Sequence, residues 1–295
     1  MASKVQTIRF NDEIIIGGEN VFLDNKDKGE FPNKCAFGLE ITDIEPTDWL
    51  NSLCETIGRE EIKNPVEWSK KYYINYKPDF IFINFIGTHQ DKLNRSAEEC
   101  IEILNEILKE ISIPIIVKFS GNFEKQNQVI TKCAEKAIRQ IIIGSAVQEN
   151  YRVPTAAALA NNHYLIAESP IDVNIAKQLN ILITQLNFPL SRIIIDPLTG
   201  GLGYGLEYTY SVMERIRLQL FNNDEILSSP MICFVGQETW KIKEIKDEKE
   251  KEKQIETGIN WEITTAIPLI IAGANIIIVR HPQSLLKLRE FIKQV

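Results

Sequence analysis

The chain is 295 residues long, and its 40 acidic and 33 basic residues give a net charge of −7. This mildly acidic balance, without any basic arm, argues against nucleic acid as the main partner. The longest apolar stretch, residues 267–279, is too short to cross a bilayer, and residues 1–10 do not form a signal peptide, so we expect a cytoplasmic protein without membrane contact.

A β-hairpin is the first predicted element. Residues 5–10 and 13–16 flank Asn11 and Asp12, a pair that suits a two-residue turn. Two glycines, Gly17 and Gly18, follow the second segment. We expect residues 1–18 to close the N-terminal end of a larger barrel, which is a structural role.

Eight short apolar segments with the length of strands come next. Most are rich in Ile, Val and Phe on both faces and do not alternate with polar residues, as expected for parallel strands that are covered on both sides. They are residues 36–41, 80–84, 115–118, 140–143, 164–167, 192–196, 231–235 and 275–279.

Helical patterns separate these strands. Residues 96–111 begin with a capping-box pattern at Ser96 and Glu99, and their apolar residues recur every three or four positions. The other predicted helices are residues 66–76, 126–139, 154–161, 171–187, 204–220, 257–272 and 282–293.

The alternation of strand and helix, repeated eight times, predicts the fold class. It indicates an α/β protein with one (β/α)₈ TIM-barrel domain over residues 1–295, in which the crossovers are right-handed. A doubly wound open sheet is the alternative. Eight units without a break in composition favour closure of the ring.

Residues 240–256 differ in composition from the rest of the chain. Residues 241–256 contain six lysines and six acids and almost no apolar residues. Balanced charge of this kind is typical of a solvated segment. We expect a surface excursion between the seventh strand and its helix, either a plain loop or a mobile flap that contacts a partner.

The sixth predicted strand delivers an acid into a glycine-rich loop. Asp196 ends the strand, and Pro197 and four glycines follow at positions 200, 201, 203 and 205. The carboxyl ends of barrel strands form the functional face, and glycine lets main-chain N–H groups approach a ligand closely. The spacing matches neither the dinucleotide G-x-G-x-x-G pattern nor a Walker loop, so NAD or ATP is not favoured. Asp196 is equally suited to capping the loop.

Other polar residues at strand ends leave two interpretations open. Residues 148–150 follow the fourth strand, and Lys118 and Asn84 end the third and second. Each either faces the barrel mouth or caps local structure. The three histidines have no metal-ligand spacing, and the five scattered cysteines suit reduced buried thiols, not a zinc site or an iron–sulfur cluster. No self-sufficient catalytic set is present.

Motifs in order along the whole chain resemble one family. The longest, residues 194–208, reads Ile-Ile-Asp-Pro-Leu-Thr-Gly-Gly-Leu-Gly-Tyr-Gly-Leu-Glu-Tyr. Shorter ones are residues 14–19, 149–151, 169–174, 178–183, 213–218, 258–262, 272–274 and 280–282. Together they resemble the small subunit of the corrinoid iron–sulfur protein, whose archaeal counterpart is the delta subunit of the acetyl-CoA decarbonylase/synthase complex.

The resemblance implies a TIM barrel that forms a heterodimer with a larger gamma subunit. The larger subunit would carry the iron–sulfur cluster and a mobile corrinoid-binding domain, and the corrinoid (a cobamide) would lie between that domain and the mouth of this barrel. A separate pterin methyltransferase would deliver a methyl group from methyl-tetrahydropterin, and acetyl-CoA synthase would receive it in the reductive acetyl-CoA pathway. This chain would be a non-catalytic subunit that helps to hold the cofactor.

A cofactor-facing surface follows from combining this resemblance with the glycine-rich loop. The residues that we expect to face the corrinoid are Asp196, Thr199, Gly200, Gly201, Leu202, Gly203, Tyr204, Gln148, Glu149 and Asn150.

Two alternative functions remain open. A pterin-dependent methyltransferase is also a barrel, and Asp196 with Asn84 or Asn122 would hold the pterin, although the third strand ends in Lys118 without an acid at its tip. A purely structural subunit without cofactor contact is the other. Residues 84–87 and the charged segment match no motif of the family.

Overall fold

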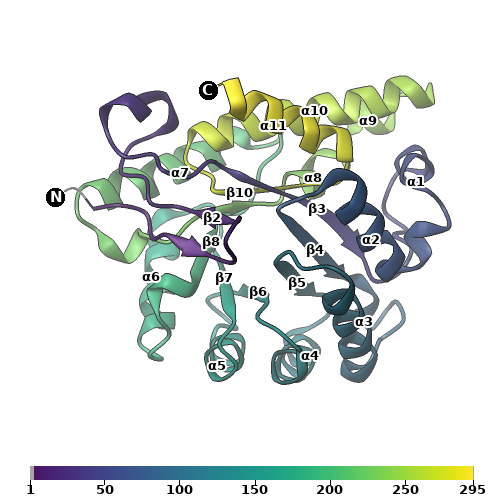
Figure 1. Ribbon diagram of the computed structural model, residues 1–295, viewed down its shortest axis with the longest axis horizontal. Helices are drawn as coiled ribbons and strands as arrows, with labels where there is room; N and C mark the ends of the chain where they lie inside the picture. The colour runs from purple at the N-terminus through teal and green to yellow at the C-terminus, as the bar shows by residue number, and fades with distance from the viewer. Residues whose placement is uncertain (1–2, 295) are drawn as a thin grey trace.

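Eight parallel strands form a ring in the computed structural model, which describes residues 3–294 (Figure 1). The strands are β3 (Ala36–Thr42), β4 (Phe80–Phe85), β5 (Ile115–Phe119), β6 (Ile142–Ala146), β7 (Tyr164–Glu168), β8 (Ile193–Asp196), β9 (Ile232–Cys233) and β10 (Ile276–Val279). They pair in the order β8-β7-β6-β5-β4-β3-β10-β9. A parallel bridge between Ile195 and Met231 joins the two ends of this series. The predicted TIM barrel is therefore confirmed, and the open sheet is not formed.

A helix follows each strand and covers the outside of the ring (Figure 1). Polar caps start several of them: Asn64 accepts the N–H of Val66, and Ser96 and Glu99 form the predicted capping box. The helices that follow the strands are α2 (Pro65–Tyr76), α3 (Ala97–Glu110), α4 (Phe123–Lys136), α5 (Arg152–Ala160), α6 (Val173–Thr184), α7 (Leu206–Phe221), α10 (Lys251–Ile271) and α11 (Pro282–Gln294).

Three shorter helices lie in the connections after β3 and β9. They are α1 (Asn51–Ile57), α8 (Val235–Thr239) and α9 (Lys243–Lys246). None of the three belongs to the predicted set. The seventh predicted strand, residues 231–235, is correspondingly shortened to the two residues of β9, because α8 begins at Val235.

The N-terminal hairpin closes the end of the barrel where the strands begin. Its strands β1 (Ile8–Arg9) and β2 (Ile15–Ile16) are antiparallel, and Figure 1 shows β2 near the middle of the ring. The Phe10 ring packs 5.1 Å from that of Phe80 and 4.8 Å from that of Tyr164, which are the first residues of β4 and β7.

The turn of the hairpin differs from the prediction. Phe10 N–H donates to the Ile14 carbonyl at 3.0 Å, so three residues and not two make the connection. The Asn11 side chain accepts the N–H groups of Glu13 and Ile14 at 2.9 and 2.7 Å. This side-chain bond replaces the compact two-residue turn that the Asn-Asp pair predicts.

The charged segment 240–256 lies largely at the surface after β9, as expected, but it contains α9 and the start of α10 where a loop was expected. Trp240 and Ile245 are buried, and α10 begins at Lys251, six residues before the predicted start at position 257. Lys251 reaches Glu55 of α1 at 2.7 Å, and Figure 1 places α9 and α10 beside α1. Burial of these apolar residues outweighs the polar composition, so the segment is not a free loop.

Within residues 3–294, no helix combines the length and the apolar character that a membrane-spanning helix requires.

Candidate functional site

A lysine between two carboxylates lies at the carboxyl end of the barrel. Lys118 on β5 places its Nζ 3.0 Å from Glu168 Oε2 on β7 and 3.0 Å from Asp196 Oδ2 on β8. Ser145, on the intervening strand β6, donates to the same Glu168 oxygen at 2.6 Å. The ammonium also lies 3.8 Å from the centroid of the Phe234 ring. Four strands and the start of the β9–α8 connection thus supply one polar cluster.

Burial and charge act against each other in this cluster. Burial acts to lower the pKa of Lys118, but the attraction of Asp196 and Glu168 outweighs it, so the pKa lies above its usual value. Lys118 in turn lowers the pKa of Glu168. Burial raises the pKa of Asp196, whose side chain is 1% exposed against 25% for Glu168. Glu168 is therefore the more accessible of the two carboxylates that pair with Lys118.

A second polar cluster lies on the other side of the mouth. Glu40 on β3 accepts from Arg280 Nε at 2.8 Å, from Asn84 Nδ2 at 3.1 Å and from Gln237 Nε2 at 2.9 Å. The Arg280 guanidinium lies 4.4 Å from the centroid of the Trp49 ring. Both oxygens of the buried Glu40 carboxylate are thus satisfied by side chains of this chain.

The glycine-rich loop after β8 is fixed by hydrogen bonds to its neighbours. Leu198 N–H donates to Asp196 Oδ1 at 3.0 Å, and Gly200 N–H donates to Thr209 Oγ1 of α7 at 2.8 Å. Thr199 Oγ1 accepts the N–H of Phe234 at 2.9 Å, and Leu202 N–H reaches Thr265 of α10 at 3.3 Å. These hydrogen bonds consequently hold the loop against α7, α10 and the β9–α8 connection.

Two glycines in this loop adopt backbone conformations that side chains disfavour. Gly203 has φ of 75° and Gly205 has φ of 100°, and the second precedes the first residue of α7. This turn moves the start of the helix from the predicted position 204 to Leu206. Tyr204, which lies between the two glycines, is 51% exposed and donates its hydroxyl to Glu244 of α9 at 2.8 Å.

The second part of the predicted surface lies in the turn after β6. Gln148 and Glu149 are exposed there, whereas Asn150 is 8% exposed and exchanges two amide hydrogen bonds with Asn127 of α4, at 2.9 and 3.0 Å. Asn150 is thus committed to local structure. Within residues 3–294, no hydrogen bond or ion pair joins this turn to the glycine-rich loop.

Exposed apolar side chains gather in the connections around the same end of the barrel. Of the ten large exposed apolar residues in the described part of the chain, seven follow the carboxyl ends of β4 to β8. We call these seven the apolar rim: Leu93, Phe123, Val153, Ile171, Leu198, Tyr204 and Tyr208. These side chains come from five successive connections, or from the first turns of the helices that follow them, at one end of the barrel.

The sequence identified only part of this arrangement. It located Asp196, Lys118, Asn84 and the glycine-rich loop, but it missed Glu40, Glu168 and Arg280. An acid inside the apolar segment 36–41 was the available signal for Glu40, because a charge on a buried strand requires a partner. Among residues 3–294, no group of three His, Cys, Asp or Glu residues is placed to hold a metal ion.

Comparison with known proteins assigns the chain to a family. The family model for the CO dehydrogenase/acetyl-CoA synthase delta subunit matches residues 7–290. The chain belongs to this family. The delta-family chain is 32% identical over 286 residues to acetyl-CoA decarbonylase/synthase complex subunit delta 2 of Methanosarcina acetivorans, a match that covers 94% of the chain and 65% of the relative. It is 28% identical to subunit delta of Methanopyrus kandleri, covering 91% and 67%. The chain thus spans about two thirds of the length of these relatives.

Solved structures show a similar fold. Dihydropteroate synthase from Xanthomonas albilineans has a TM-score of 0.60 at 11% identity and matches 100% of the delta-family chain and 98% of its own. The dihydropteroate synthase of Thermus thermophilus has a TM-score of 0.56, also at 11% identity, and covers 92% and 98%. At this identity the likeness concerns the barrel alone.

Proposed function

We propose that this delta-family chain is the small subunit of a corrinoid iron–sulfur protein, and that its barrel mouth covers a corrinoid held jointly with a larger subunit. The assembly would carry a methyl group from methyl-tetrahydropterin to acetyl-CoA synthase. The observation that carries the proposal is the apolar rim, which borders the β4 to β8 side of a mouth whose buried charges are already paired with one another.

The residues of the mouth fit a flat cofactor with amide side chains. Tyr204 and Tyr208 are 51% and 65% exposed, and Gly203 and Gly205 leave bare backbone on either side of Tyr204. The accessible Glu168 carboxylate is an acceptor for amide N–H groups. When bound, the corrinoid supplies the cobalt that bears the methyl group, and this chain's own residues position and shield it.

The side chains that a pterin site would use are committed elsewhere. Asp196 pairs with Lys118, and Asn84 donates to Glu40. Asn122 caps α4 by accepting the N–H of Lys125 at 2.9 Å. This arrangement favours a carrier subunit over a methyltransferase. Titration with methyl-tetrahydrofolate tests the difference, because a carrier subunit alone should bind the pterin poorly.

The apolar rim gives the direct test of the proposal. We expect Tyr208→Glu to weaken association with the corrinoid-loaded large subunit by at least about tenfold, because it places a charge in a desolvated contact. Ile74→Glu is the matched control, since Ile74 is also 65% exposed but lies on α2, away from the rim. Affinity is measured by isothermal titration calorimetry. Equal effects of the two substitutions would refute the proposed surface.

A further inference from the structure

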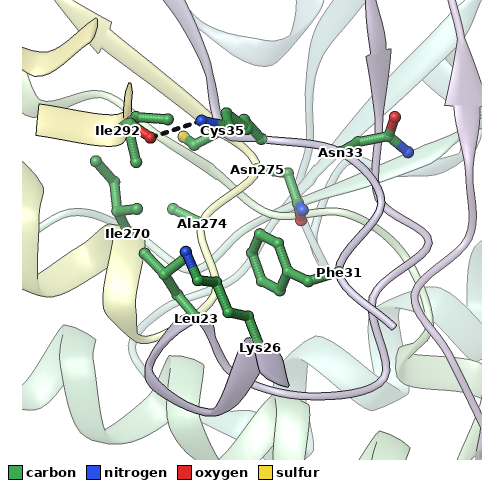
Figure 2. A pocket seen from close by; sticks show the side chains of 10 residues that line it. Leu23, Lys26, Phe31, Asn33, Cys35, Ile270, Ala274, Asn275 and Ile292 are labelled. Atoms are coloured by element: carbon green, nitrogen blue, oxygen red, sulfur yellow. Dashed lines mark hydrogen bonds between the residues drawn. The ribbon is translucent and has the colours of Figure 1, made fainter. Parts of the chain in front are cut away.

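A cavity of about 190 Å³ lies at the opposite end of the barrel from the mouth (Figure 2). It is enclosed by the 3₁₀ segment η1 (Leu23–Lys28) and the chain that follows it, and by α10 and α11. Its apolar walls come from Leu23, Phe31, Ile270, Ala274 and Ile292. An enclosed apolar cavity of about 150 Å³ is large enough to bind benzene, so this partly open cavity has room for a ligand with a single ring.

The polar lining of the cavity is cationic. Two lysines, Lys26 and Lys34, border it, and no Asp or Glu is among its lining residues. Lys34 Nζ donates a hydrogen bond to the Ile292 carbonyl at 2.9 Å, which Figure 2 shows as a dashed line. Lys26 is an exposed residue whose side chain makes no hydrogen bond or ion pair within residues 3–294, and Figure 2 shows its ammonium directed between Leu23 and Ala274 at the edge of the cavity.

Asp24 and Asp27 flank Lys26 in η1 but form no ion pair with it within residues 3–294, and two acidic groups close to the other lining residues are bound elsewhere. Glu19 accepts from the Asn275 side chain at 2.7 Å, and Asp79 pairs with Arg289 at 2.9 Å. Burial raises the pKa of the Cys35 thiol well above its usual range, so this lining residue stays neutral. The cavity therefore combines apolar walls with one uncommitted ammonium group.

We propose that this cavity binds a small organic carboxylate with a compact apolar body, such as one ring. The ring would lie against Phe31 and Ile270, and the carboxylate would pair with Lys26. A ligand in this position would contact η1, α10 and α11 together. Because it would bind the folded chain and not the unfolded chain, it would raise the free energy of unfolding. The site is separate from the mouth and does not depend on the function proposed above.

Benzoate and its neutral analogue benzamide are the probes that test this site. With the full chain, we expect benzoate to bind about fivefold more tightly than benzamide, because only benzoate pairs with Lys26. We also expect benzoate to raise the melting temperature. Calorimetry gives the affinities, and differential scanning fluorimetry gives the melting temperatures. Failure of benzoate to bind, or equal affinities for the two probes, would overturn the proposal.

Substitutions in the lining locate the binding. Lys26→Gln should reduce benzoate affinity to that of benzamide, and Ala274→Leu should remove binding of both by filling the cavity. Lys28→Gln is the control, since Lys28 lies in the same segment but does not line the cavity. Circular dichroism of each unliganded variant shows that it is folded. Full binding by the folded Ala274→Leu variant would place the ligand elsewhere and refute the site.

Discussion

Lys118 is the residue that allows two carboxylates to lie together at the mouth. Its ammonium is 3.0 Å from both Glu168 and Asp196, and its side chain is 17% exposed. Removing one partner of a buried ion pair destabilises a folded protein by more than the intact pair stabilises it. The remaining charge is then buried without a counter-charge and without water around it. The charge balance of this cluster therefore depends on the Lys118 side chain.

The substitution Lys118→Met tests this dependence. We expect it to lower the free energy of unfolding by about 3 kcal/mol, since it leaves two carboxylates close together without a cation. Adding Glu168→Gln should recover part of the loss by removing one of the two charges. Urea denaturation measures both effects. Lys132→Met is the control, because its ion pair with Glu98 is half-exposed and should matter little.

Glu262 is a second residue whose negative charge would destabilise the folded chain, because its carboxyl group is buried. It is fully buried in α10, and it accepts the N–H of Arg280 at 2.6 Å and of His281 at 3.2 Å. Burial raises the pKa of this carboxyl from 4.5 to about 7. The folded state therefore binds the Glu262 proton more tightly than the unfolded state does. The contribution of the protonated carboxyl to the free energy of unfolding is complete below pH 4.5 and is lost as the pH rises through about 7.

Replacement by glutamine isolates this pH dependence. Glu262→Gln cannot ionise, so its stability relative to the native chain should increase by up to about 3 kcal/mol between pH 5 and pH 8. His281 is present in both proteins, and its own titration largely cancels in the difference. Urea denaturation at a series of pH values provides the measurement. A difference that does not change with pH would show that Glu262 is not protonated in the folded chain.

At the scale of elements, the glycine-rich loop after β8 contains two adjacent glycines with different surroundings. A Cβ on Gly200 would lie 2.4 Å from the Gly205 carbonyl oxygen, which is backbone and cannot move aside cheaply. A Cβ on Gly201 would have its nearest neighbour at 3.7 Å, which is an ordinary contact. The first glycine is therefore required by close packing of the loop on itself, and the second is not.

These two glycines form a matched pair of substitutions. We expect Gly200→Ala to lower the free energy of unfolding by about 1–3 kcal/mol, as overpacking does, and Gly201→Ala to change it by less than about 0.5 kcal/mol. Thermal and urea denaturation measure both. Because the loop carries Tyr204, Gly200→Ala should also weaken association with the large subunit. Equal stability of the two variants would contradict the observed loop geometry.

The elements also show where prediction from sequence stops. The eight strands and their eight following helices could be predicted because each has its own apolar pattern. The seven-residue helix α1 could not, because its position depends on distant contacts such as the bond from Ser52 to Gln254. The helical conformation within residues 240–256 could not be predicted for the same reason: the composition is polar and most of the segment is exposed, but Trp240 and Ile245 are buried against the barrel.

At the scale of the whole molecule, closure of the ring assembles the site. Lys118 and Asp196 are 78 residues apart, and Glu40 and Arg280 are 240 apart. The sequence indicated that the strand ends would meet, and it located the glycine-rich loop. It could not indicate which acid pairs with which base, because pairing depends on side-chain directions that only the closed barrel determines.

The two ends of the barrel have different roles in this account. The hairpin covers the end where the strands begin, and Phe10 packs against Phe80 and Tyr164 there. The other end has paired charges at its centre and the apolar rim around it. The mouth is therefore the end that we propose a partner covers, and the glycine-rich loop lies within it.

Hydrogen–deuterium exchange tests the central claim most directly. The chain is compared when free, with the corrinoid-free large subunit, and with the corrinoid-loaded large subunit. We predict that the partner protects connections bearing the apolar rim, and that the corrinoid adds protection at residues 199–204 and 148–149. If loading the corrinoid leaves exchange in these loops unchanged, or if protection appears only at the hairpin end, the barrel mouth does not cover the cofactor.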